Sequence, residues 1–151
     1  MNAAATAIIA ALKLAPLPGE GGFFRATWRT TTGSSIYFLI TTDDFSALHR
    51  ISHDEIWHFY DGDPVDHVQI DPDGGNCTIA RMGPAVLAGD QPQVIVPAGR
   101  WQGARLAPPP AGSNPTRARH GYALFGCTVS PPWDERGCEL AARPALIRKF
   151  P

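Results

Sequence analysis

The sequence is poor in three features that would point to particular classes of protein. Its three cysteines, Cys77, Cys127 and Cys138, lie far apart and form no CxxC pair, which argues against a disulfide framework and against a zinc knuckle. No run approaches the ~18 apolar residues of a membrane-spanning helix. The formal net charge is only −1 and the basic residues are scattered, so no surface for a polyanion is indicated. We expect no membrane partner, no nucleic-acid partner and a reducing, cytoplasmic location.

The remaining composition is that of a folded domain. Hydrophobic residues make up 44% of the 151 residues and charged residues make up 18%, a balance that is typical of globular chains. This length supports one domain with a real core and is short for two. We therefore expect a single domain over residues 1–151.

One short amphipathic helix is predicted near the N-terminus. Over residues 3–14 the apolar side chains of Ala5, Ile8, Ile9 and Leu12 recur at helical spacing, and Pro16 blocks a continuation. The segment lacks the basic residues that precede the apolar part of a signal peptide, so we expect no signal peptide here.

Further along the chain, short segments rich in aromatic and β-branched residues alternate with turn clusters. The predicted strands are residues 23–32, 35–42, 55–60, 65–70, 77–81, 93–96 and 122–129. Short strands at near-regular spacing favour a sandwich or barrel over βαβ units. Residues 108–119, with four prolines, are predicted to form a long surface loop. Residues 139–150 are predicted to form a C-terminal helix or turn.

Four blocks of the sequence resemble one family of small proteins. The blocks are Pro18-x-Glu20-Gly21-Gly22-Phe23-Phe24-Arg25, then His49-Arg50 with Asp54-Glu55-x-Trp57-His58-Phe59-Tyr60-x-Gly62, then Pro97-x-Gly99-x-Trp101-Gln102, and finally Gly126-Cys127-Thr128-Val129-x-Pro131. The second and third blocks are similar to the two short motifs of the cupin superfamily. In this order, the four blocks resemble the single-domain cupins of unknown function called Cupin_5, over nearly the whole chain.

The resemblance implies a mainly β fold, a double-stranded β-helix or jelly-roll barrel with a short N-terminal helix. Residues 1–18 would form the helix and lead-in, residues 19–138 the barrel and residues 139–151 a C-terminal segment. Related cupins commonly form dimers, and Phe23, Phe24 and Trp28 carry more aromatic surface than one small barrel easily covers. We expect a homodimer with one small-molecule pocket in each barrel, while the fold itself implies no reaction.

Metal-binding cupins offer three histidines and one glutamate from the two motifs, and this sequence departs from that set. Arg50 stands near one expected histidine and Gln102 stands where the last one would be, which leaves only His49 and Glu55. A neutral amide oxygen is a poor ligand for late transition metals. We expect no tightly held metal and no other cofactor, with a weakly bound divalent metal as the alternative.

His49 and Glu55 are the candidate catalytic residues. Imidazole is the usual proton shuttle near neutral pH. A carboxylate that points into an apolar barrel needs a partner, for which Arg50, Arg25 or His49 is available. In a strand through residues 54–60, Glu55 shares its face with Trp57 and Phe59, whereas His58 lies on the opposite face.

The candidate ligand-binding residues are Arg25, Trp57, Phe59 and Gln102. Trp57 and Phe59 would supply aromatic wall, and the turn before Gln102 would aim its amide into the pocket. We expect His49, Glu55, Trp57 and Gln102 to line one common pocket.

Three functions remain open. The leading hypothesis is a small-molecule-binding cupin for a sugar-like, nucleotide or carboxylate ligand. The second is an isomerase, epimerase or lyase in which His49 is the base and Glu55 orients it or acts as the acid. The segment from Glu20 to Arg25 also resembles a strand of the deoxysugar epimerases, although Phe125 stands where those enzymes have a tyrosine acid. The third is a metal-dependent oxygenase or isomerase.

Overall fold

The chain begins with a short helix that is capped at both ends. The computed structural model describes residues 1–109 and 119–141, and α1 spans Ala3–Leu12. The Asn2 side chain accepts a hydrogen bond from the Ala5 N–H (2.9 Å), as helix-capping asparagines do. Lys13 takes the left-handed backbone conformation at the other end. The helix therefore ends at Leu12, short of the predicted limit, because the left-handed turn stops it before Pro16 does.

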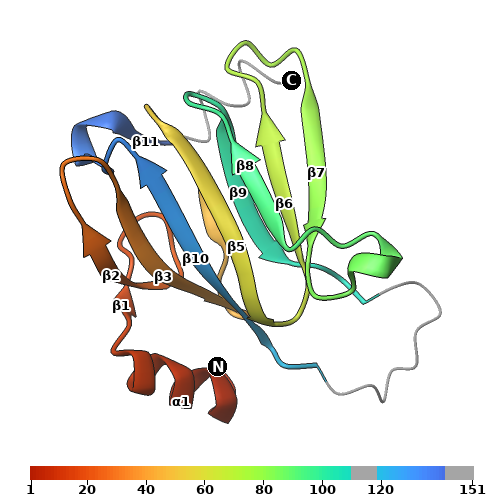
Figure 1. Cartoon of the computed structure of the whole chain (residues 1–151). Coiled ribbons are helices and arrows are strands. Elements are labelled where there is room, and N and C mark those ends of the chain that lie inside the picture. The colour runs from red at the N-terminus through yellow and green to blue at the C-terminus, as the bar shows by residue number, and fades with distance from the viewer. Residues whose placement is uncertain (110–118, 142–151) are drawn as a thin grey trace.

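The strands of the described residues form two antiparallel sheets (Figure 1). The six-stranded sheet has the order β1-β2-β3-β10-β5-β8, and the five-stranded sheet has the order β11-β4-β9-β6-β7. The first sheet contains β1 (Ala15–Pro16), β2 (Phe23–Arg29), β3 (Ser34–Thr41), β5 (Asp54–Gly62), β8 (Gln93–Val96) and β10 (Tyr122–Ser130). The second contains β4 (Ser46–Ile51), β6 (Val65–Ile70), β7 (Cys77–Met82), β9 (Trp101–Leu106) and β11 (Cys138–Leu140). Short 3-10 turns lie at Val86–Ala88 and Glu135–Gly137.

The chain crosses repeatedly from one sheet to the other, since β3, β5, β8 and β10 belong to the first sheet while β4, β6, β9 and β11 belong to the second. This winding, with one N-terminal helix, confirms the predicted mainly β jelly-roll fold. Each strand that the residue pattern predicted is present, with ends that differ by a few residues.

Two inner strands, β4 and β9, were not predicted from residue pattern. In β4 the register shifts between Ser46 and His49, so that both polar side chains face inward although they are three residues apart. In β9 the residue that follows Gln102 is Gly103, where a Cβ atom would lie 3.0 Å from the Ser46 carbonyl oxygen. The close approach of the two strands therefore leaves little room for a side chain at this position.

The C-terminal prediction needs a correction. Cys138–Leu140 forms a strand, β11, which pairs with β4 through Cys138 and Ile51, and does not begin a helix. Its short stretch of backbone hydrogen bonds completes the edge of the five-stranded sheet. The rest of the predicted C-terminal element, residues 142–151, and most of the predicted loop at 108–119 lie outside the described residues.

The space between the sheets is filled by apolar side chains around Trp57. Its ring meets Phe38, Phe125 and His67 edge to face, with ring centroids 5.5, 5.3 and 4.9 Å away. All four side chains are 1% exposed or less. Edge-to-face aromatic contacts add to the stabilisation that burial provides. This packing holds Trp57 in one position at the centre of the barrel.

The outer face of the six-stranded sheet is covered at one end by α1 (Figure 1). Ala5 of the helix packs in one apolar cluster with Leu39 and Tyr122, and Phe23 joins this cluster. Phe24 packs against the central core. The chain itself therefore covers two of the three aromatic residues on which the dimer prediction rested.

The third aromatic residue, Trp28, is 47% exposed. The homodimer stays a prediction, which light scattering on the purified protein tests. In the two described stretches of the chain, no helix is both long enough and apolar enough to span a membrane.

Candidate functional site

A cavity of about 290 Å³ lies between the six-stranded sheet and β4. Most of its wall is apolar and includes Phe24, Ile36 and Phe38. At one end it is lined by Trp28 and Trp133, which are 47% and 41% exposed, so this end is open to solvent. The volume equals that of about ten water molecules and accommodates one small organic molecule.

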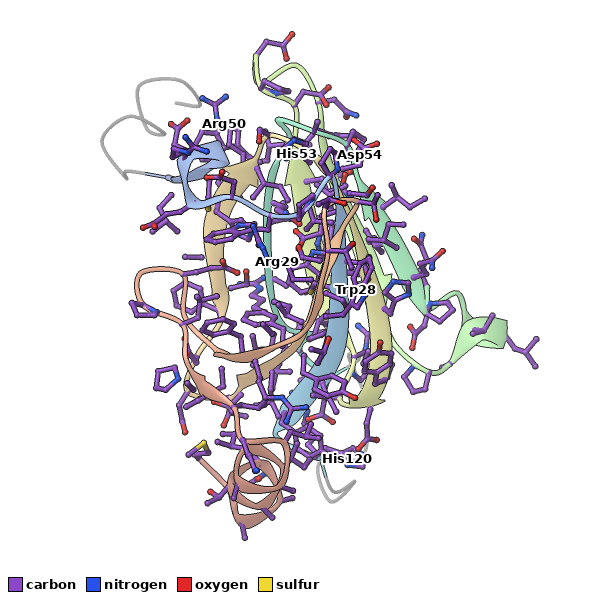
Figure 2. The ribbon with its side chains drawn as sticks, turned by 60° about the vertical axis from the view of Figure 1, so that its left-hand side comes forward. Trp28, Arg29, Arg50, His53, Asp54 and His120 are labelled. Atoms are coloured by element: carbon purple, nitrogen blue, oxygen red, sulfur yellow. The ribbon has the colours of Figure 1, made fainter. Side chains whose placement is uncertain are left out.

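The open rim is held together by a contact between two segments that are far apart in sequence. Arg29 donates a hydrogen bond from Nη1 to the Trp133 carbonyl oxygen (2.8 Å). Figure 2 shows Trp28 and Arg29 close together, between the end of the molecule with Arg50 and the end with α1. The contact ties β2 to the segment before β11 and keeps both tryptophans at the rim.

The buried end of the cavity is polar. It is lined by Glu20, His49 and Glu55, which come from the loop after β1, from β4 and from β5. The Glu20 side chain is 17% exposed and the His49 side chain 4%, and Glu55 is 7% exposed. The structure thus brings the two predicted catalytic residues together and adds a carboxyl group that was not predicted.

The ring of His49 is oriented by its own strand. Nδ1 lies 2.8 Å from the Ala47 carbonyl oxygen. A carbonyl oxygen can only accept, so Nδ1 carries the proton and, in the neutral ring, Nε2 keeps its lone pair. The second neighbour of Nδ1 is Glu20 Oε1, at 3.7 Å. His49 is therefore presented as a proton acceptor through Nε2.

Glu20 is placed by a glycine-rich turn. Gly22 has φ +70°, and a Cβ atom there would lie 2.8 Å from the Phe38 ring, so only glycine fits this turn without a shift. The Ser46 hydroxyl donates a hydrogen bond to Glu20 Oε1 (2.8 Å). Burial raises the pKa of Glu20 to about 7, against the lowering effect of the Ser46 hydrogen bond.

Glu55 ends a buried hydrogen-bond chain between the two sheets. The Trp57 indole N–H donates to Gln102 Oε1 (2.9 Å), and Gln102 Nε2 donates to Glu55 Oε2 (2.6 Å). Gln102 is fully buried, and it lies behind the cavity wall instead of lining it. Burial raises the pKa of Glu55, while His49 and the Gln102 hydrogen bond lower it and Glu20 raises it further. Gln102 therefore acts as a positioning residue for Glu55.

His67, on β6, was not predicted as a site residue. It is fully buried against Trp57, and neither of its ring nitrogens has a hydrogen-bond partner among the described residues. Burial lowers the pKa of His67 to about 4, so the ring is neutral at physiological pH. It does not line the cavity itself, but it packs against Trp57, which does.

Of the four predicted ligand-binding residues, only Trp57 lines the cavity, because Phe59 and Arg25 lie elsewhere, as Gln102 does. Phe59 shares the inward face with Glu55, as the alternation of β5 predicts, but its ring packs on Phe125 at 5.9 Å. Arg25 lies on the opposite face of β2, where its guanidinium group stacks over the Tyr37 ring at 5.4 Å. The geometry of the cavity does not support a ligand-binding role for either residue.

Of the three predicted partners of Glu55, His49 interacts with it electrostatically, whereas Arg25 and Arg50 are engaged elsewhere. Arg50 pairs with Glu139 (2.6 Å) and stacks over the Trp101 ring. Glu55 is instead held by the neutral Gln102 amide. The structure agrees with the prediction that His58 faces away from the barrel, since it contacts Gln93 on the outer face.

The donor set does not fit a cupin metal. The amide oxygen of Gln102 accepts from the Trp57 indole, and the side chain lies behind the cavity wall, so it does not offer a ligand to the cavity. Only His49 and Glu55 remain of the motif set, and two protein ligands are fewer than a tight transition-metal site uses. Within residues 1–109 and 119–141, no group of three His, Cys, Asp or Glu side chains is arranged to hold a metal ion.

Glu20 and His67 carried weak sequence signals. Glu20 lies between apolar segments in a turn with three glycines, Gly19, Gly21 and Gly22, where no periodicity assigns a side chain to a face. His67 alternates with Asp66 in β6 and faces the same side as Val65. A histidine on the apolar face of an alternating strand is the one signal that was available.

The antiparallel strands wound between two sheets, with a cavity between the sheets that opens at one rim, define a cupin barrel. The family model Cupin_5, described as "Cupin superfamily (DUF985)", matches residues 6–141. The chain belongs to the Cupin_5 family, as its four sequence blocks predicted.

Solved structures support this assignment. The chain is similar to a protein from Shewanella oneidensis, with 33% identity, a TM-score of 0.82 and coverage of 98% of this chain and 89% of that chain. It is similar to a hypothetical protein from Leishmania major, with 28% identity, a TM-score of 0.86 and coverage of 97% and 92%. A cupin 2 conserved barrel domain protein from Rhodopseudomonas palustris shares the fold at 15% identity, with a TM-score of 0.57 and coverage of 89% and 79%. A search of curated proteins found no match.

Proposed function

We propose that the chain binds one small molecule in this cavity. The apolar part of the ligand contacts the aromatic walls, and one polar group reaches Glu20, His49 and Glu55. The observation that carries the proposal is the division of the cavity into an apolar wall and a buried polar end. Small-molecule sites are commonly built from apolar walls with a few convergent polar groups.

The charges at the polar end distinguish between the expected ligand classes. Two carboxyl groups, Glu20 and Glu55, lie there, whereas Arg29 is at the rim. A carboxylate or phosphate at the polar end would meet like charges in a site of low dielectric constant. The cavity therefore favours a neutral, sugar-like or cationic polar group over a nucleotide or carboxylate.

A cavity-filling variant tests the proposal. Ala26 lines the cavity on β2, so Ala26→Phe places a ring where the ligand would lie. Thr27→Phe, at the adjacent exposed position that does not line the cavity, is the matched control. We expect wild type to bind benzyl alcohol, by isothermal titration calorimetry, at about millimolar affinity or better. Ala26→Phe should lose binding and Thr27→Phe should keep it.

If benzyl alcohol, benzylamine and benzoate all fail to bind the wild-type protein, the cavity is not a site of this kind. Equal binding by wild type and Ala26→Phe would show that the probe binds elsewhere.

Proton transfer is a second candidate function, which one specific observation favours. His49 presents Nε2 as an acceptor at the same end of the cavity as Glu20, whose pKa burial raises to about 7, and a carboxyl group with a pKa near neutrality suits the acid in general acid–base catalysis. None of the three tyrosines of the chain lines the cavity, and Phe125 is buried in the core. The acid of this candidate mechanism is therefore Glu20, not a tyrosine.

Hydrogen–deuterium exchange of a carbon acid tests this second candidate. In deuterium oxide, His49 Nε2 would take a proton from the carbon next to the carbonyl of phenylacetone and return a deuteron to that carbon. Proton NMR should show exchange above the buffer rate with wild type and with His53→Gln, but not with His49→Gln. Exchange at the buffer rate with wild type would reject the candidate for this class of substrate.

A further inference from the structure

When its two carboxyl groups are ionised, the polar end of the cavity has more hydrogen-bond acceptors than donors. The Ser46 hydroxyl donates to one oxygen of Glu20, and the Gln102 amide donates to one oxygen of Glu55. The second oxygens, Glu20 Oε2 and Glu55 Oε1, receive no hydrogen bond from the residues that the structure describes. His49 Nε2 adds a further acceptor when the ring is neutral.

The positive charge near these carboxyl groups is also deficient. His49 Nδ1 is 3.7 Å from Glu20 Oε1, and its proton points to the Ala47 carbonyl. In the described part of the chain, neither Glu20 nor Glu55 forms an ion pair with an arginine or lysine. Two largely buried carboxyl groups without a cation are costly to ionise. A ligand that supplies both donors and positive charge would remove this cost.

We infer that the polar group of the ligand is a primary ammonium, carried on a small apolar or aromatic body. An ammonium has three N–H donors and no acceptor, which complements Glu20 Oε2, Glu55 Oε1 and His49 Nε2. The aromatic wall suits such a ligand as well, because aromatic rings attract cations and pack against apolar groups. This inference rests on the proposed small-molecule function and narrows its ligand to amines.

Binding of an amine should be linked to pH through Glu20. The titratable groups that interact electrostatically with Glu20 are His49 of β4, at 3.7 Å, and Glu55 of β5, Cys127 of β10 and Cys138 of β11. Burial raises the pKa of both thiols, so they stay neutral and do not compete with Glu20. Because the pKa of Glu20 is about 7, its ionisation should strengthen ammonium binding as the pH rises from about 6 to about 8.

Three probes with one ring and different polar groups test the inference. Benzylamine is a cation, benzyl alcohol is neutral and benzoate is an anion. By calorimetry at about pH 8, the wild-type protein should bind benzylamine about tenfold more tightly than benzyl alcohol, since the charged group makes charge-assisted hydrogen bonds, and benzoate most weakly. The preference for the amine should shrink at about pH 6, while alcohol binding should not change.

Glu20→Gln supplies the matched variant. It should lower benzylamine affinity about tenfold at about pH 8 and remove the pH dependence, whereas the affinity for benzyl alcohol, which loses only a neutral hydrogen bond, should fall about threefold or less. Glu135→Gln, an exposed carboxylate outside the cavity, should change nothing. Circular dichroism checks that both variants fold, and the pH series on wild type needs no variant.

The results separate this inference from the proposal beneath it. If benzyl alcohol binds as tightly as benzylamine at about pH 8, or if Glu20→Gln keeps the preference for the amine, the ammonium inference is overturned and small-molecule binding stands. If none of the three probes binds, the proposed function fails too.

Discussion

Replacing Gln102 with leucine should show how much the buried hydrogen bonds of Gln102 to Trp57 and Glu55 stabilise the fold. The two hydrogen bonds of Gln102 measure 2.9 and 2.6 Å, and all three side chains are at most 7% exposed. Leucine has nearly the same volume but offers neither donor nor acceptor. The variant therefore removes polar partners without opening a large void.

The size of the effect follows from what the substitution leaves behind. A buried polar group that loses its partner costs about 1–3 kcal/mol, and more when it is charged. Gln102→Leu leaves both the Trp57 indole and the Glu55 carboxyl without a partner, so the free energy of unfolding should fall by about 2–4 kcal/mol. The Gln102 hydrogen bond lowers the pKa of Glu55, so its loss should cost more at high pH, where the carboxylate is ionised.

Urea denaturation, followed by tryptophan fluorescence and circular dichroism at about pH 5 and about pH 8, measures this cost. The control is Gln93→Leu, which removes an exposed amide that contacts His58 on the outer face and should cost less than about 0.5 kcal/mol. Combining Gln102→Leu with Glu55→Leu should recover part of the loss, because no charge then needs a partner. A cost below about 1 kcal/mol, or a cost independent of pH, would refute the proposed role of Gln102.

Five further predictions concern the titration of Glu20 and of His67, thiol labelling, metal content and assembly. The pKa of Glu20 rises from its ordinary value of 4.5 to about 7, so stability falls as the pH rises through this window, and Glu20→Gln should remove about 3 kcal/mol of that fall in urea denaturation. Burial lowers the pKa of His67 from 6.5 to about 4, so the free energy of unfolding falls as the pH falls through that window, and His67→Leu should abolish this loss. Unchanged pH profiles of stability in Glu20→Gln and His67→Leu would contradict the two assignments. Cys77 is exposed, whereas Cys127 is 3% exposed and burial raises the pKa of its thiol. A thiol reagent should therefore label Cys77 in the native protein and Cys127 only in urea, and labelling of Cys127 in native Cys77→Ser would disprove this. Elemental analysis of protein purified without chelator should find no stoichiometric transition metal, and one metal per chain that disappears in His49→Ala would show the opposite. Light scattering should give about twice the 16.2 kDa mass of one chain, and the monomer mass at micromolar concentration would exclude the dimer.

The parts of the fold that were predictable are those with regular periodicity. The alternation of β5 placed Glu55 and Trp57 on one inward face, and the structure has them there at 7% and 1% exposure. His58 was assigned to the outer face by the same period of two, and it lies there. Local residue pattern was sufficient in this strand because no bulge separates these three residues.

The unpredicted features depend on irregular backbone or on contacts between the sheets. The bulge in β4 turns both Ser46 and His49 inward, which hides the strand from any period-two pattern. Glu20 reaches the cavity from a glycine turn, where periodicity carries no information. The partner of Glu55 is Gln102 on the opposite sheet, and the choice between this amide and an arginine is made by cross-sheet geometry.

A crystal structure of the protein soaked with 4-bromobenzyl alcohol tests the central claim most directly, because anomalous scattering locates the bromine independently of the protein. The account predicts one molecule between the sheets, with bromine toward Trp28 and Trp133 and the hydroxyl group within hydrogen-bond distance of Glu20 or Glu55. Bromine found only on the outer surface, or a molecule in the cavity with its hydroxyl group turned to the open rim, would contradict the account.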